Sequence, residues 1–293
     1  MDQLRRRQVF GPDGYPVAGA VLSVPDPVDS HTHDFLELAV LLDGTVGYQT
    51  VRGFRRLDAG AVTAVRPGEW HAYLDPDRAV IGNLYLGAEL LHGELRWLLE
   101  IGDLGRFLLR GGVAEGCLEA TGRQRVRRTL TELAGGTALP GTAAAISAVG
   151  SAYAVLGELA RLSLDAGRRP GLSAPVRQMV MLLSRRPAET WTLAALAAQT
   201  GYSVSHLHRE FRAQLGLTPM AWLATTRAEL AASLLLQTER PVAWIGRQVG
   251  WPDPNYFSRC FRRAYGISPT AYRVRNAPSA ELRSTDPLTL TRV

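Results

Sequence analysis

The sequence contains no lysine and only two cysteines, Cys117 and Cys260, so every side chain with a permanent positive charge is an arginine. Two cysteines are too few for a disulfide framework or a cysteine-rich zinc site, which indicates a reducing compartment. The chain also lacks an apolar signal segment near its start and any uninterrupted apolar run of about 18 residues. We therefore expect a cytoplasmic protein that does not associate with a membrane.

The positive charge is concentrated in one part of the chain. Residues 173–275 hold 13 arginines against 5 acidic residues, whereas residues 1–172 hold 18 against 20. The total length of 293 residues is enough for two domains. A basic domain beside a mildly acidic one predicts a nucleic-acid-binding module joined to a domain with a different task.

Hydrophobic patterning divides the chain in the same way. From Val17 to Leu86, short β-type runs alternate with turn residues, which is typical of a barrel or sandwich, and helical periodicity follows. The sequence predicts an α+β multidomain protein. Its parts are a β-barrel with trailing helices in residues 1–165, a glycine- and proline-rich linker at 166–175, an all-helical domain at 176–275 and a tail at 276–293.

A long helix is predicted from Thr142 to Leu164. Apolar residues recur along it at alternating steps of three and four, which gives an a/d seam of a little over two heptads. The seam consists of Ile146, Val149, Tyr153, Leu156 and Ala160. It either packs within its own domain or forms a contact between two copies of the chain, and we expect a homodimer.

The basic segment contains one pattern twice, at residues 193–223 and 242–273, and each copy reads as a helix, a glycine-containing turn and a second helix. Identical residues recur at a constant offset of 50. These are Arg209, Phe211, Arg212, Gly216, Pro219 and Ala221, matched by Arg259, Phe261, Arg262, Gly266, Pro269 and Ala271. The repeat predicts two helix-turn-helix motifs on one chain.

The second helix of each copy has two distinct faces. Val204, Leu207, Phe211 and Leu215 are expected to point inward in the first copy, and Phe257, Phe261 and Ala264 in the second. The outward residues are Ser205, His208, Arg209 and Arg212, then Asn255, Ser258, Arg259 and Arg262. Such groups can read base edges in the major groove, because arginine suits guanine and asparagine suits adenine.

A helix that begins at Thr218-Pro219 and runs to about Leu236 joins the two copies. At about 1.5 Å per residue it is close to 30 Å long. This approaches the roughly 34 Å between successive major grooves on one face of a duplex. We therefore expect two reading heads one helical turn of DNA apart.

The second copy closely resembles the signature of the AraC/XylS family of bacterial transcription regulators. The residues that carry the resemblance are Ile245, Gly250-Trp251, Asn255 to Arg259, Phe261 to Arg263, Gly266, Ser268-Pro269 and Tyr272-Arg273. Gly246 and Trp251 depart from it, because the family usually has alanine and phenylalanine there. The resemblance covers about 100 residues. It implies that the first recognition helix makes most base contacts and that Arg263 and Arg273 contact phosphates.

Three histidines and a glutamate stand out in the first half. His31, His33 and Glu37 share parity and would project from one face of a strand, and His71 follows a Pro-Gly turn. Their spacing is similar to the two cupin motifs, except that Pro25 and Asp75 replace an expected glycine and asparagine. The four residues either bind a transition metal or line an effector pocket. By the same resemblance, a cupin-like barrel in such regulators senses a small molecule.

We therefore predict a non-enzymatic, effector-controlled regulator that binds promoter DNA as a homodimer and acts with RNA polymerase. No cofactor is required, and the sole candidate is a divalent metal at the histidine cluster. The alternative is a metal-dependent cupin enzyme fused to a DNA-binding module. It would use the same His31, His33, Glu37 and His71, but no second constellation supplies an acid, base or nucleophile.

Overall fold

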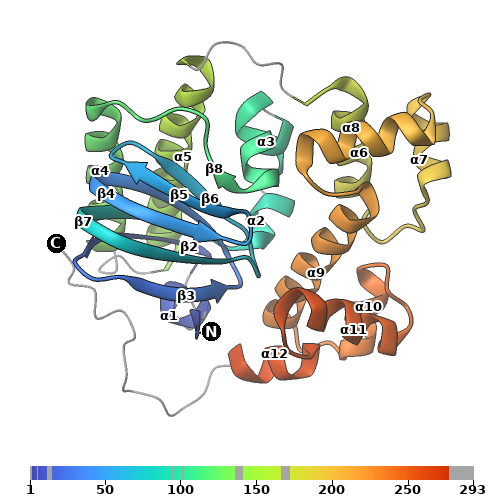
Figure 1. Cartoon of the computed structure of the whole chain (residues 1–293). Helices are drawn as coiled ribbons and strands as arrows, with labels where there is room; N and C mark the ends of the chain where they lie inside the picture. Colours follow the sequence, from blue (N-terminus) through green and yellow to red (C-terminus); the bar gives the residue numbers. More distant parts are fainter. Residues whose placement is uncertain are drawn as a thin grey trace. The chain divides into compact units, whose positions relative to one another are not determined.

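The computed structural model describes residues 2–4, 6–11, 15–93, 95–100, 102–135, 141–165 and 172–276 (Figure 1). Contacts between Cα atoms divide the chain into two compact units. The first, here called the sheet unit, includes residues 1–87 and 111–168, and the second, the helical unit, includes residues 88–110 and 169–277. Residues 166–171 of the expected linker and 277–293 of the expected tail lie outside the described residues.

The sheet unit contains one eight-stranded sheet, antiparallel except for the pairing of its first strand with β3. The strands are β1 (Asp2–Leu4), β2 (Val17–Val24), β3 (Val28–His33), β4 (Leu36–Thr50), β5 (Gly53–Asp58), β6 (Val62–Val65), β7 (Trp70–Leu86) and β8 (Gly112–Val113). The β structure predicted between Val17 and Leu86 is therefore confirmed, but β4 and β7 are long strands of 15 and 17 residues and not short ones.

Strands β4 and β7 organise this sheet because they pair with each other along almost their whole length, from Leu36 opposite Leu86 to Thr50 opposite His71. Register shifts interrupt the pairing between Leu41 and Gly47. On one side of the shifts β4 pairs with β6 and β7 pairs with β2; on the other, β4 pairs with β5 and β7 pairs with β3. The sheet folds over at this irregularity, and side chains from both halves form one buried core.

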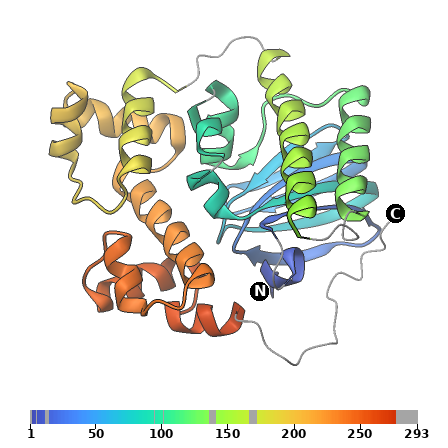
Figure 2. The same cartoon turned by 180° about the vertical axis from the view of Figure 1, so that it is seen from behind.

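Two helices, α4 (Ala120–Gly135) and α5 (Gly141–Asp165), cover one face of the sheet (Figure 2). Helix α4 approaches the strands at two glycines. A Cβ atom on Gly82 would lie 2.8 Å from Leu130 Cδ1, and one on Gly19 would lie 2.9 Å from Leu133 Cδ2. The glycines thus allow a close helix–sheet approach that larger residues would prevent. Arg125 of α4 forms two hydrogen bonds, of 2.7 and 2.8 Å, with Glu158 of α5.

Helix α5 presents only part of its apolar surface to the sheet unit. Ala148, Ala152 and Val155 are buried, whereas Ile146 is 69% exposed and Tyr153 is 37% exposed. Within the described residues, the stretch Thr142–Leu162 of this helix has the length and apolar composition that a membrane span requires. Of the five residues of the predicted seam, Ile146 and Tyr153 are thus exposed, Leu156 is buried, and Val149 and Ala160 are half-buried.

The helical unit combines residues from both halves of the sequence. Its elements are α2 (Ala88–His92), the 3-10 helix η1 (Arg96–Glu100), α3 (Gly102–Arg110), α6 (Ala174–Arg185), α7 (Leu193–Thr200), α8 (Val204–Leu215), α9 (Pro219–Gln237), α10 (Val242–Gln248), α11 (Pro254–Tyr265) and α12 (Pro269–Asn276). Residues 88–110 fall in the first domain by sequence, yet α2 packs on α9 and α3 on α8. Buried leucines, among them Leu90, Leu104 and Leu108, account for this packing.

Local signals define where the helices of the repeat begin and end. Side-chain oxygens of Thr192, Ser203, Thr218 and Asp253 accept the backbone N–H three residues ahead. Left-handed glycines end three helices, at Gly201, Gly216 and Gly266, with φ of 75°, 77° and 75°. The predicted start of the joining helix at Thr218-Pro219 is therefore confirmed.

Gly246 fits a space that has no room for a larger residue. A Cβ atom there would lie 2.8 Å from the Trp251 carbonyl oxygen and 2.9 Å from the Phe257 ring. We expect Gly246→Ala to lower the free energy of unfolding of the helical unit by about 1–3 kcal/mol through overpacking. Chemical denaturation measures the loss. Gly135→Ala in α4 is the control, because nothing lies within 4 Å of the position that its Cβ atom would take. Equal effects of the two substitutions would contradict the packing argument.

Candidate functional site

Helix α8 separates buried from exposed side chains as its spacing predicts. Leu207, Phe211 and Leu215 are buried with at most 2% exposure. Of the four predicted outward residues, Ser205, Arg209 and Arg212 are exposed and His208 is half-buried. The prediction that Val204 points inward is wrong: as the first residue of the helix, it lies before the buried stripe and is 39% exposed. Helix α8 thus has an exposed face that carries the guanidinium groups of Arg209 and Arg212.

Helix α11 repeats this arrangement in the second motif. Phe257 and Phe261 are fully buried. The predicted outward residues are again accessible: Asn255, Arg259 and Arg262 are exposed, and Ser258 is half-buried. Arg263, the expected phosphate contact, is also exposed. The Arg259 guanidinium lies 5.7 Å from the centre of the Tyr256 ring, a distance that allows a cation–π contact. Both second helices therefore present polar side chains opposite an apolar core.

Two arginines of the basic segment donate hydrogen bonds to backbone carbonyl groups. Arg273 Nε donates to the Leu235 carbonyl, and its Nη2 donates to the Arg240 carbonyl at 2.6 Å. Arg227, which sequence reasoning did not single out, donates from Nε to the Pro187 carbonyl at 2.7 Å. A Cβ atom added to Gly250 would lie 2.7 Å from Arg227 Nη2. The guanidinium group therefore packs against the turn of the second motif. Burial lowers the pKa of Arg227. No pattern in the sequence distinguishes Arg227 from the exposed arginines.

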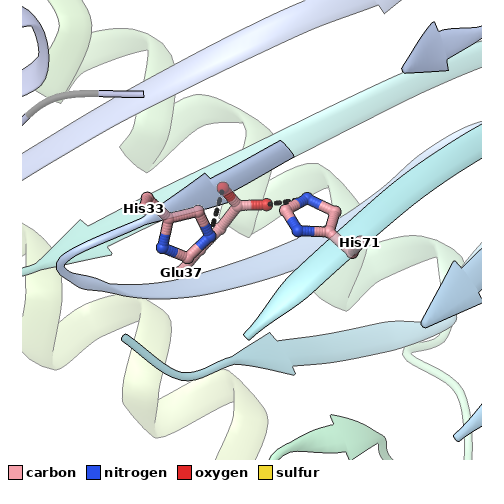
Figure 3. Close-up of side chains that lie close together, drawn as sticks. All are labelled: His33, Glu37 and His71. Atoms are coloured by element: carbon pink, nitrogen blue, oxygen red, sulfur yellow. Dashed lines mark ion pairs between the residues drawn. The ribbon is translucent and has the colours of Figure 1, made fainter. Parts of the chain in front are cut away.

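A second site lies inside the sheet unit, where three strands bring together two histidines and a glutamate (Figure 3). His33 ends β3, Glu37 lies near the start of β4 and His71 near the start of β7. Their exposed fractions are 0%, 2% and 0%. His33 Nε2 lies 3.6 Å from Glu37 Oε2, and His71 Nε2 lies 3.5 Å from Glu37 Oε1. The carboxylate is thus flanked by two imidazole rings.

The surroundings lower the pKa of two of these groups, for different reasons. Burial lowers the pKa of His33 to about 4, so its ring is neutral at neutral pH. Burial alone would raise the pKa of Glu37, but the nearby His71 and His33 rings outweigh it and lower this pKa to about 2. The cluster therefore holds an ionised carboxylate beside a neutral imidazole in a site closed to bulk solvent.

The structure brings together three of the four residues predicted for this site. The prediction that residues 31, 33 and 37 share one strand face is wrong, because a bend at Asp34-Phe35 separates β3 from β4. Glu37 instead meets His33 from β4, which is separated from β3 in the sheet by β7. The fourth residue, His31, lies at the edge of the group: its ring centre is 4.2 Å from that of His71, and its Nδ1 contacts the Asp29 carbonyl.

Two family models match the chain, one for each part. Residues 24–135 match the AraC-like ligand binding domain, and residues 196–275 match a helix-turn-helix domain. The chain belongs to the AraC family of transcription regulators. In this AraC-family protein the matched ligand-binding region includes residues 88–110, whose contacts in the structure are with the helical unit.

Relatives of this AraC-family protein include the arabinose operon regulatory protein of Salmonella typhimurium. The two are 35% identical over 105 residues, which are 36% of this chain and 37% of that protein. The match thus spans just over a third of that relative's length. The HTH-type transcriptional activator RhaR of Klebsiella pneumoniae is 27% identical over 285 residues, with 94% of this chain and 98% of RhaR covered.

An apo ToxT variant from Vibrio cholerae shares the fold, with a TM-score of 0.51 at 12% identity and coverage of 89% of this chain and 98% of ToxT. The two relatives named above, the arabinose operon regulatory protein and RhaR, are regulators of transcription. They agree with the prediction that the chain is not an enzyme, and they lend no support to the alternative of a metal-dependent cupin enzyme.

Proposed function

We propose that this AraC-family protein regulates transcription by binding promoter DNA through α8 and α11, under the control of a small molecule bound in the sheet unit. One observation carries the DNA-binding part: two helix-turn-helix motifs, joined by the 19-residue helix α9, each expose arginines opposite a closed apolar core. At about 1.5 Å per residue, α9 is about 28 Å long, close to one helical turn of DNA.

The exposed residues differ in what they are suited to contact. Arg209, Arg212 and Arg259 present planar guanidinium groups that can pair with two acceptors of guanine, and Asn255 can pair with adenine. Ser205, His208, Ser258 and Arg262 complete the proposed reading surface. Arg263 lies one position away from the reading stripe, where a phosphate contact is favoured. RNA polymerase is the further partner that we propose for the promoter-bound protein.

Comparison of Arg209→Ala with Arg263→Ala tests these roles. The first should weaken binding to a selected high-affinity sequence by about 1–3 kcal/mol and relax base preference at one position. The second should weaken binding to all sequences similarly and reduce the salt dependence by about one unit of slope. Fluorescence anisotropy with selected and random duplexes, over a series of salt concentrations, measures both. If the two variants lost the same affinity on both duplexes, the division between base and phosphate contacts would be refuted.

Two exposed residues of the predicted seam on α5 support a homodimer. Ile146 and Tyr153 lie on the same side of the helix, outside its buried face, and an apolar stripe of this kind is suited to packing against its own copy. We expect Ile146→Glu to shift the protein from dimer to monomer in sedimentation velocity. Ser147→Glu is the control, because Ser147 is exposed on a different side of α5. A dimer that persists with Glu at position 146 would exclude this contact.

A further inference from the structure

The buried cluster of the sheet unit has the spacing of a metal site. The nitrogen–oxygen distances of 3.5 and 3.6 Å between the two histidines and Glu37 are longer than a good hydrogen bond. Two ligand atoms that each lie about 2.1 Å from one ion, at a tetrahedral angle, are about 3.4 Å apart. All three residues offer a ligand atom within 4.8 Å of the others. The separations therefore match ligands of a shared ion better than they match direct hydrogen bonds.

Hydrogen bonding around His33 supports the same assignment. Its Nδ1 lies 2.8 Å from the Phe35 carbonyl oxygen. A carbonyl oxygen only accepts, so Nδ1 carries the proton and Nε2 holds the lone pair. That lone pair faces a carboxylate oxygen of Glu37. Such a backbone contact on the distant ring nitrogen is how proteins orient a metal-binding histidine.

The remaining polar atoms also lack other partners. His33 Nε2, Glu37 Oε1 and both ring nitrogens of His71 form no hydrogen bond with any part of the chain that the structure describes. Buried polar atoms without partners are costly, by about 1–3 kcal/mol each. A cation placed among them would satisfy the Nε2 lone pairs and the carboxylate at the same time.

We propose that His33, Glu37 and His71 bind one divalent transition metal ion, which connects strands β3, β4 and β7 of the sheet unit. Two imidazole nitrogens and one carboxylate suit zinc, iron or manganese. Calcium and magnesium prefer sites made of oxygen ligands alone. Three protein ligands leave at least one coordination position for water or another small ligand. The site is independent of the helices that bind DNA in the proposed function.

Metal binding to the full-length protein tests this proposal. Protein stripped with a chelator is titrated with zinc by calorimetry, and cobalt is added separately so that its visible absorption reports the ligands. We expect one ion per chain, a cobalt spectrum of low coordination number, a rise in the melting temperature of the sheet unit, and no comparable binding of magnesium. Absence of saturable zinc and cobalt binding in the wild-type protein would overturn the proposal.

Variants locate the ion. Glu37→Gln and, independently, His71→Gln preserve shape and should each weaken zinc binding at least about 100-fold, because each removes a direct ligand. The matched control is the double variant His206→Asn/His208→Asn, which removes two histidines of the helical unit and should leave zinc affinity unchanged. Circular dichroism of the metal-free variants establishes that they are folded. Zinc binding that survives in a folded Glu37→Gln or His71→Gln protein, or that falls in the control, would place the ion elsewhere. DNA binding is measured on the same stripped protein, so failure of the metal site is distinguished from failure of the proposed function.

Discussion

Phe261→Ala is expected to lower the free energy of unfolding of the helical unit by about 3–5 kcal/mol. Phe261 is fully buried in the core of the second motif. Its ring centre lies 4.8 Å from that of Tyr265, 5.3 Å from that of Tyr272 and 5.9 Å from that of Phe257. Removal of the ring leaves a cavity between three aromatic neighbours on α11 and α12, which cannot close without moving both helices.

Tryptophan fluorescence during urea unfolding measures this loss. Five of the six tryptophans belong to the helical unit, so the signal reports mainly on that unit; they are Trp97, Trp191, Trp222, Trp244 and Trp251. Tyr256→Ala is the matched control, because Tyr256 is an aromatic residue of the same helix with 48% exposure. Its removal should change stability by about 0.5 kcal/mol or less. A loss at Phe261 no larger than this would show that the second motif does not depend on its aromatic core.

Leu130→Ala should lower the stability of the sheet unit by about 2–5 kcal/mol. Leu130 is fully buried in α4, and its methyl groups lie 2.8 and 3.1 Å from where Cβ atoms on Gly82 and Gly19 would stand. The side chain thus fills the space above two strands, and its truncation leaves a cavity between the helix and the sheet. Thermal unfolding followed by circular dichroism measures the effect, with the exposed neighbour Thr131→Ala as control.

A double substitution tests whether Leu130 and Gly82 affect stability through their contact. Gly82→Ala alone should also destabilise, since its Cβ atom would overlap Leu130. In the double variant the shorter side chain at position 130 relieves this overlap. The loss of stability in the double variant should therefore be smaller than the sum of the two single losses. Strictly additive losses would mean that Leu130 and Gly82 do not act through their contact.

The helix-turn-helix pair was predictable because its signals are local. Ser203 and Thr218 cap the start of a helix and the left-handed Gly216 ends one, and each acts within a single helical turn. The same types of signal occur in both copies of the repeat. Prediction of the buried cluster of His33, Glu37 and His71 required knowledge of how the strands pair, which is not local in the sequence. Parity within one strand selected His33 and Glu37, but they meet across strands, because pairing partners are set by the whole sheet.

Residues 88–110 show the limit of sequence patterns most clearly. Their leucine spacing indicates amphipathic helices and therefore a buried face, but it does not indicate which surface covers that face. Connectivity favoured the sheet unit, since the segment lies between β7 and β8. In the structure the covering surfaces are α8 and α9, which begin more than 90 residues later in the chain.

The pairing of β7 also determines when the chain can fold during its synthesis. Strands β2, β3 and β4 all pair with β7, which ends at Leu86. A nascent chain that stops before Trp70 therefore exposes the edges of three strands whose common partner has not yet been made. The helices of the repeat pack mostly on near neighbours and can form soon after they leave the ribosome, whereas non-local strand pairs form slowly. The sheet unit is thus the part of this protein whose yield depends most on the rate of translation and on protection of unpaired strands.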